Sequence, residues 1–481
     1  MDRTGRALVW FSCFAVALVP LFPVRDLPLI DLPNHLAQGW MWLHWDDAAW
    51  GFRECYRLDQ GPLPYVAYHG FLRWAAEVVP IHIANKIWMG LSIVGLGGAT
   101  AYLLRGLGRP PLLALAALPL YWSGSTIWGF ANFMASQTLL VLALALVANR
   151  HLWIGALAGA ALYFVHPLGL AAWIGLAPLV ARGVGPRLLV SLPAIGAFVA
   201  GMVLAPSGDL HPASGLSFAG HWPSWDDVWH DFPQLVYAFV SRDEALLLLA
   251  GVLALVLVTA LLVDRPLDGE RDLRPFALVA MAAFYHFGLP RNIDRPMELA
   301  GISSRFPPLL VLMLLTLPPR GILSTGRTLL LLVPLLAMNL WHGATLAGRL
   351  SRGRADEIAF HDVVDRLPPR PEVLLIIEDA RHPALPELHH LRMHWQALIQ
   401  IERGGYDPQG WGPPFPIVAT EKCKQRWPTL DLSLAQNFQW EAQGRAYQWF
   451  VVRGDAPWVL RGAPVERVAQ NGAWSLWKRK D

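Results

Sequence analysis

The sequence predicts an α-helical membrane protein that crosses the bilayer about eleven times and carries a small α/β domain at its C-terminal end. Of the 481 residues, 54% are hydrophobic and only 16% are charged, whereas soluble proteins carry about 25% charged residues. The mean hydropathy of +0.36 agrees with this bias. A soluble core cannot hold so much apolar surface without exposing it, so lipid must be the solvent for much of the chain.

Eleven apolar runs come near the roughly 20 residues that a bilayer-spanning helix needs. The first run follows Arg3 and Arg6 as in a signal peptide, but no small-x-small cleavage site comes after it, so we expect a retained helix. The expected spans are Ala7–Val24, Ile83–Leu104, Pro111–Trp122, Phe130–Ala148, Leu152–Val165, Leu168–Ala181, Leu188–Ala205, Ala245–Val263, Pro275–Leu289, Phe306–Leu317 and Thr328–Leu346.

The distribution of arginine between short loops sets the expected orientation. Arg3 and Arg6 precede the first span and Arg150 follows the fourth, which places them on one side if the helices alternate. The short turns Ser123–Gly129 and His166–Pro167, on the other side, contain no arginine or lysine. Cytoplasmic loops carry the excess of positive charge. We therefore expect a cytoplasmic N-terminus and an extracytoplasmic C-terminal domain.

The tail after the last span reads as a soluble α/β domain. A transmembrane domain is expected over residues 1–348 and the soluble domain over 349–481. Short β-rich runs lie between turn residues, as in strands of a small sheet. These runs are Glu372–Ile377, Pro416–Thr420, Gln448–Val452 and Trp474–Lys478.

The first outer loop holds the strongest candidates for chemistry. Asp26, Asp31 and His35 lie within ten residues of one another, next to the expected membrane surface. A carboxylate held at a low-dielectric surface can act as a general base or bind a divalent cation. The competing interpretation for Asp26 is solvation beside Arg25.

Asp31 has a structural alternative as well. It occupies the N-cap position of a helix opened by Pro33, and aspartate is favoured there without any catalytic role. The segment Asn34–Trp50 has apolar residues at helical spacing and predicts an amphipathic helix lying in the membrane interface.

A second set of candidates lies between later spans. Arg291, Arg295 and Arg305 fall in one short outer loop, and an arginine beside a helix start can hold a phosphate with two parallel hydrogen bonds. The alternative is that Arg305 reaches lipid headgroups. His166 ends an apolar helix and is a candidate substrate contact. The proline that follows it favours the alternative of a solvated cap at the helix end.

Three cysteines, Cys13, Cys55 and Cys423, exclude a framework of several disulfides. Cys55 and Cys423 both fall on the outer side of the expected topology, where disulfides persist. The topology therefore allows them to pair and to tie the tail to the first loop.

Together these features resemble the GT-C superfamily of integral membrane glycosyltransferases. Members of that superfamily have an acidic motif after the first helix, which here would be Asp26 to Asp31, and an arginine near a late helix, here Arg305. The closing segments 448–454 and 474–477 look like the tail strands of bacterial members. The resemblance therefore implies a location in a bacterial inner membrane. This chain lacks the tight Asp-x-Asp pair, so a divalent cation is allowed but not required.

The resemblance implies transfer of a sugar from a polyprenyl-phosphate donor to an extracytoplasmic acceptor. An aspartate would deprotonate the acceptor hydroxyl, and arginines would stabilise the departing phosphate. We favour Asp31 over Asp26 as the base because packing of the helix that it starts would fix its direction. The expected partners are the lipid-linked donor and membrane lipids, and no nucleic acid. The alternatives are a polytopic transporter and a non-catalytic protein of envelope assembly.

Overall fold

The computed structural model describes two compact units. The first contains Met1–Pro20 and Trp88–Leu346, and the second contains Leu21–Ile87 and Ala347–Asp481. The described residues are 3–59, 61, 63–204, 219–263, 272–295, 300–321, 323–379, 381–383, 385, 391–411, 415–454 and 460–480.

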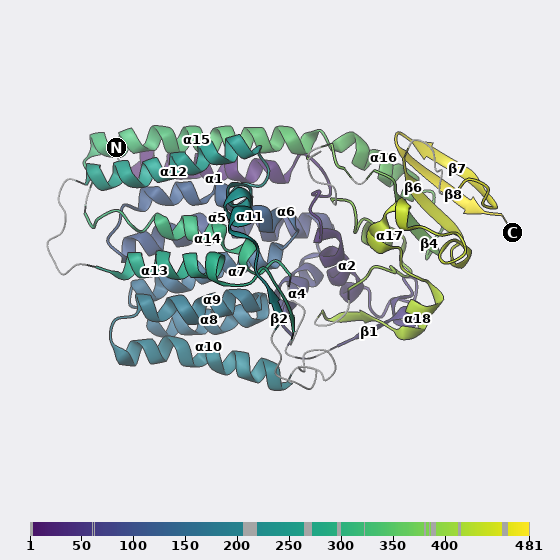
Figure 1. Ribbon diagram of the computed structural model, residues 1–481, viewed down its shortest axis with the longest axis horizontal. Helices are drawn as coiled ribbons and strands as arrows, with labels where there is room; N and C mark the ends of the chain where they lie inside the picture. The colour runs from purple at the N-terminus through teal and green to yellow at the C-terminus, as the bar shows by residue number, and fades with distance from the viewer. Residues whose placement is uncertain are drawn as a thin grey trace. The chain divides into compact units, whose positions relative to one another are not determined.

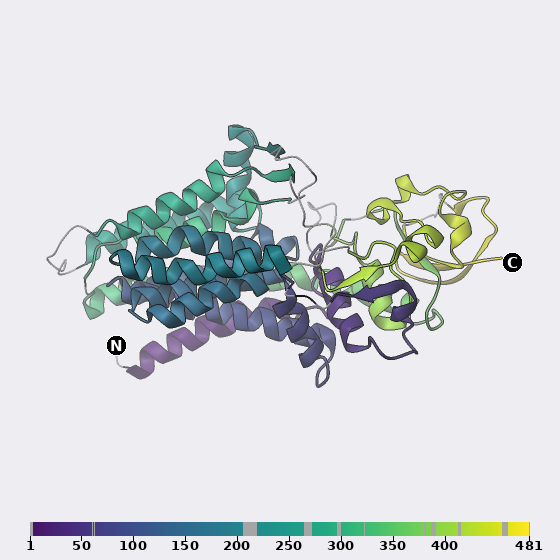
Figure 2. The same cartoon turned by 90° about the horizontal axis from the view of Figure 1, so that it is seen from below.

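Unit 1 is a bundle of helices (Figure 1). Its helices α7 to α10 pack side by side, as Figures 1 and 2 both show. The helices are α1 (Arg3–Leu18), α5 (Ile81–Gly106), α6 (Gly124–Ile127), α7 (Ala131–Ala148), α8 (Leu152–Val165), α9 (Pro167–Val180), α10 (Val184–Leu204), α11 (Trp225–Val236), α12 (Arg242–Leu262), α13 (Arg274–Ala283), α14 (Pro307–Leu314) and α15 (Thr325–Ser351). A short hairpin joins β2 (Ala219–His221) to β3 (Asn292–Arg295).

The apolar helices support an integral membrane protein. Among the described residues, five candidate spans are long enough and apolar enough to cross a bilayer, and four further apolar helices are shorter. The long ones are Ile81–Gly106, Ala131–Ala148, Val184–Gly201, Arg242–Leu262 and Thr325–Val364. The last candidate runs beyond α15 because α16 follows almost at once. The expected number of about eleven crossings stays a prediction.

Two expected spans differ from straight α-helices. The run Pro111–Trp122 forms two 3₁₀ helices, η2 (Pro111–Ala117) and η3 (Pro119–Tyr121), because its prolines lack the N–H that a continuous α-helix needs. After α13, the chain continues as a π-helical turn, Phe284–Gly288. Such turns often mark functional segments of helices.

Unit 2 contains the expected sheet and several short helices. Four strands pair in the order β4-β6-β8-β7, with β4 and β6 parallel and the remaining pairs antiparallel. The elements are α2 (Leu32–Leu43), α3 (Phe52–Cys55), β1 (Tyr56–Leu58), α4 (Val66–Ala75), α16 (Arg354–Val364), β4 (Val373–Ile377), α17 (Gln396–Arg403), β5 (Ile417–Ala419), α18 (Glu421–Arg426), β6 (Trp449–Arg453), β7 (Val465–Asn471) and β8 (Trp474–Arg479).

All four predicted strands exist, but one pairs elsewhere and one sheet strand was missed. Strand β7 was not predicted because this edge strand is largely exposed and rich in polar residues. Strand β5 does not join the four-stranded sheet; it pairs with β1 from the first loop, with Tyr56 opposite Ala419. Such pairing between distant segments depends on the path of the chain and leaves no local pattern.

A disulfide joins the first loop to the tail beside this strand pair. The Cys55–Cys423 bond has a Cα–Cα distance of 5.4 Å. The predicted pairing is therefore confirmed, and Cys13 is a buried free thiol. The tail and the first loop thus form one unit, whereas the sequence had assigned the loop to the transmembrane domain.

Helix α2 corrects the expectation of an amphipathic surface helix. Nine of its twelve residues are buried, on more than one face. Its Gln38 side chain bonds the backbone of Ile417 in both directions, donating to the carbonyl at 2.8 Å and accepting from the N–H at 3.0 Å. The helix is therefore part of the core of unit 2.

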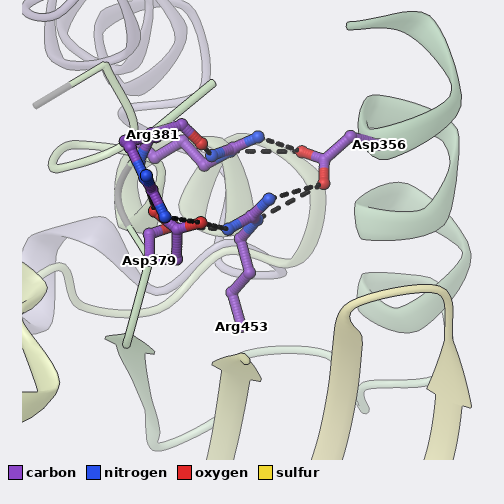
Figure 3. Close-up of polar contacts among 5 residues, drawn as sticks. Asp356, Asp379, Arg381 and Arg453 are labelled. Carbon is purple, nitrogen blue, oxygen red and sulfur yellow. Dashed lines mark hydrogen bonds and ion pairs between the residues drawn. The ribbon is translucent and has the colours of Figure 1, made fainter. Parts of the chain in front are cut away.

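An ion network that is buried at Asp356, Arg392 and Arg453 holds α16 against the loops at the ends of the sheet (Figure 3). The Asp356 carboxylate accepts hydrogen bonds from Arg392, at 2.6 and 3.1 Å, and from Arg453, at 3.3 Å. Arg453 also contacts Asp379, which accepts from Arg381 at 2.9 Å. Arg392 is completely buried. The network thus ties three segments of the tail together.

Candidate functional site

Asp31 pairs with a histidine that the sequence analysis did not identify. His394 Nε2 lies 3.3 Å from Asp31 Oδ1, and both side chains are mostly buried. Asp31 occupies the predicted N-cap position of α2, but its carboxylate makes no capping hydrogen bond. The carboxylate is therefore oriented by His394 and not by the helix backbone.

His35 lies in a group of aromatic rings. Its Nδ1 is 3.1 Å from His69 Nε2, and its ring centroid is 4.6 Å from that of Trp411. Burial lowers the pKa of His69 to about 3, so the His69 ring is neutral. The ring centroid of Trp411 also lies 6.2 Å from that of His394, and Trp411 stacks on Phe415 with a centroid distance of 4.5 Å. The aromatic group therefore lies next to the Asp31–His394 pair.

Asp26 lies in a different cluster of unit 2. Its Oδ2 is 3.0 Å from Nε2 of His361, whose Nδ1 is 2.7 Å from Glu402 Oε1. Carboxylates at both ring nitrogens favour the imidazolium form of His361, which carries two N–H donors. Burial raises the pKa of Asp26, but the hydrogen bond and charge of His361, together with Arg25, outweigh it and hold that pKa below its usual value.

The same cluster contains the side chains that could hold a metal ion. Ligand atoms of Asp26, Glu357 and His361 lie within 4.8 Å of one another. However, Glu357 already accepts the backbone N–H groups of Arg25 and Asp26, and both nitrogens of His361 face carboxylates. A metal would have to displace a proton and these bonds, so the donor set fits a proton-bridged cluster better than a metal site.

The surroundings of the two aspartates separate their possible roles. The Asp26 side chain is only 9% exposed and belongs to an ion network with Arg25 and His361. The Asp31 side chain is 18% exposed and has one ionic partner among the described residues, His394. A general base must reach a hydroxyl of the substrate within hydrogen-bond distance. This requirement is easier to meet for Asp31.

In unit 1 the structure brings Arg305 and His166 together. Arg305 Nη1 lies 3.1 Å from His166 Nε2, although the two residues are distant in sequence. Arg305 also donates to the carbonyls of Ala300, at 3.0 Å, and Gly301, at 3.2 Å. Its guanidinium lies over the ring of Phe130 at 3.8 Å. These contacts fix the position of the guanidinium at the edge of the bundle.

His166 cannot satisfy both donors that approach its ring. It is the N-cap of α9, and the backbone nitrogen of Leu168 lies 3.1 Å from Nδ1 while Arg305 Nη1 lies 3.1 Å from Nε2. A neutral imidazole has only one acceptor nitrogen, so one of these two donors faces a ring N–H. In the tautomer whose Nδ1 accepts from Leu168, Nε2 and Arg305 Nη1 are both donors, and an anionic oxygen can accept from both.

The other two arginines of this loop are Arg291 and Arg295. Arg291 Nη1 lies 3.6 Å from Asp231 Oδ2 of α11, and both side chains are well exposed. Arg295 ends strand β3, and its side chain lies outside the described residues. Among the described side chains of this loop, Arg305 is the one that contacts His166.

Comparison with solved structures finds an enzyme with a similar fold. The structure is similar to that of the arabinofuranosyltransferase AftD from Mycobacteria, with a TM-score of 0.50 and 17% sequence identity. A mutant of the same enzyme gives a TM-score of 0.52 at 16% identity. The chain therefore shares the fold of the matched part of AftD.

The likeness covers nearly all of this chain but less than half of the neighbour. The match includes 99% of the chain and 40% of AftD, or 42% of its mutant. No protein-family model and no curated protein sequence matches the chain. At this level of identity the comparison establishes the fold, and the chemistry must be argued from the residues.

Sequence reasoning missed His361, His394 and Glu402, the tail residues that face the first-loop aspartates. The tail sequence indicates strands, but no motif in it marks the side chains that face the first loop. The predicted Cys55–Cys423 pairing was the available signal, because a bond between loop and tail implies that their polar residues meet as well.

Proposed function

We propose that the protein is a membrane glycosyltransferase that moves a sugar from a polyprenyl-phosphate donor to an extracytoplasmic acceptor, with Asp31 as general base. The Asp31–His394 pair is the observation that carries the proposal. The GT-C-like fold supports the reaction class.

In the proposed reaction Asp31 accepts the proton of an acceptor hydroxyl. The hydroxyl oxygen bonds to the anomeric carbon of the sugar, and the bond from that carbon to the phosphate oxygen breaks. The polyprenyl phosphate leaves with the bonding electrons. His394 is a positioning residue, because its contact with one carboxylate oxygen orients the other toward substrate.

Arg305 and His166 would contact the phosphate of the donor. Both present N–H groups from fixed positions, and charge-assisted hydrogen bonds to a leaving phosphate strengthen as negative charge develops on it. Asp31 and Arg305 belong to different units, and each role rests on contacts within its own unit. Arg291 and Arg295 would add positive charge to the same outer loop, and His35 would support the aromatic wall.

The aromatic group beside Asp31 suits a sugar. Trp411 and Phe415 are stacked rings whose apolar faces can lie against the C–H face of a pyranose or furanose. We propose this wall as the contact for the acceptor or donor sugar near the base.

The test is transfer by Asp31→Asn in isolated membranes. The probes are radiolabelled polyprenyl-phosphate sugars, including the arabinofuranosyl donor that the AftD comparison suggests. Asparagine keeps the shape and one oxygen but cannot accept the proton, so transfer should fall at least about a hundredfold. Asp47→Asn, in the same loop but exposed, is the matched control and should transfer normally.

Two results of this assay would contradict the proposal. Normal transfer by Asp31→Asn with loss in Asp26→Asn would assign the base to the other aspartate. Normal transfer by both variants would remove the catalytic role of the first loop and favour the transporter or envelope-assembly alternatives.

A further inference from the structure

A groove lies between α1 and α15 in unit 1, away from Arg305 and His166. Its volume is about 410 Å³, and apolar side chains from both helices form its walls. Arg109 stands at this groove, directly after α5. The lining includes Val9, Trp10, Arg109, Leu112, Leu323 and Leu332.

Arg109 is buried with its hydrogen-bonding capacity incompletely used. Its side chain is 5% exposed, and its Nε has no hydrogen-bond partner among the described residues. Its Nη2 lies 3.7 Å from Asp272 Oδ2, which is beyond hydrogen-bond distance. An arginine so buried normally has its donors satisfied. The groove at Arg109 therefore lacks an acceptor.

The nearby acid does not supply that acceptor. Asp272 is bonded by Arg274 at 2.8 Å and by Arg320 at 2.8 Å. One carboxylate is thus shared by three guanidinium groups in the described part of this cluster. The excess of positive charge attracts an anion, and the apolar groove beside it attracts hydrocarbon.

We infer that this groove binds an anionic phospholipid, with the phosphate on Arg109 and an acyl chain against α1 and α15. Helix α15 is part of a candidate membrane span and α1 is a shorter apolar helix, so a lipid can enter the groove from the bilayer. A basic pocket between transmembrane helices is the arrangement that recognises lipid phosphate. The site is independent of the proposed transfer reaction.

Lipid binding to the full-length protein in detergent provides the test. Native mass spectrometry measures the bound fraction during titration with dioleoyl phosphatidylglycerol. Wild type should bind one lipid saturably, and Arg109→Gln should bind it about tenfold more weakly or worse, as expected for loss of a charge-assisted contact. Arg105→Gln is the matched control, because Arg105 is an exposed arginine in the last turn of α5, the helix that precedes Arg109.

A second variant and two further ligands complete the test. Leu332→Trp should fill the groove and displace the lipid while leaving Arg109 intact, so the proposal does not depend on the folding of Arg109→Gln. Dioleoyl phosphatidylcholine should bind more weakly, and millimolar inorganic phosphate should not compete. Equal binding of the anionic lipid by wild type, Arg109→Gln and Leu332→Trp would overturn the inference. Competition by inorganic phosphate would show an anion site and not a lipid site.

Discussion

Replacing Asp356 by asparagine tests the buried ion network of unit 2. The carboxylate accepts four hydrogen bonds from Arg392 and Arg453. Asparagine keeps one acceptor oxygen and turns an N–H₂ group toward one of the two arginines. Arg392 is 0% exposed and Arg453 9% exposed, so neither can recover its lost bonds from water.

The structure allows the size of this effect to be estimated. Removing one partner of a buried ion pair costs about 3–5 kcal/mol because the remaining charge stays buried. Each kcal/mol lowers Tm by about 2–4 °C for a unit of roughly 150–250 residues, the size range of unit 2. The Tm of the transition that unfolds unit 2 should therefore fall by roughly 6–20 °C.

Tryptophan fluorescence during heating of the purified protein measures the change. Trp395 and Trp474 stack at 5.6 Å within contact distance of the two arginines and report on this region. The matched control is Asp365→Asn, whose side chain is 70% exposed and pairs with Arg403. An exposed pair contributes about 0–1 kcal/mol. Equal Tm changes in Asp356→Asn and Asp365→Asn would refute the reasoning.

Three further predictions follow from other contacts. Arg305→Lys should lower transfer at least about tenfold without changing Tm, because lysine lacks the planar fork that reaches His166 and the two carbonyls; transfer at the wild-type rate would limit Arg305 to a contact with headgroups. The double variant Cys55→Ser, Cys423→Ser should lose about 2–5 kcal/mol of stability, and an unchanged unfolding transition in thermal scans would mean that the β1–β5 pairing alone holds loop and tail. Burial raises the pKa of Asp407 to about 6, so the folded state binds this proton more tightly than the unfolded chain and stability falls as pH rises from about 4 to about 6. Asp407→Asn should therefore be more stable than wild type by about 2–3 kcal/mol at pH 7.5 but not at pH 4; a stability difference that does not vary with pH would contradict this assignment.

The amino-acid sequence alone was enough to predict the membrane class, the approximate helical spans and three strands of the tail sheet. These features depend on local composition and period: a run of apolar residues needs lipid or a core wherever the chain takes it. The strand predictions Glu372–Ile377, Gln448–Val452 and Trp474–Lys478 succeeded for this reason. The prediction missed the exposed polar strand β7 for the same reason, since its residues show no apolar alternation.

Which side chains contact one another depends on the three-dimensional fold. Asp26 and Asp31 look alike in the sequence, yet one is bound to His361 and the other to His394. Likewise, two arginines of the same predicted loop have different partners: Arg305 contacts His166, and Arg291 pairs with Asp231. These contacts join residues far apart in the chain, and their formation depends on how β1 pairs with β5 and how the helices pack, which no local pattern encodes. The sequence therefore named the candidate aspartates, and the fold supplied their partners.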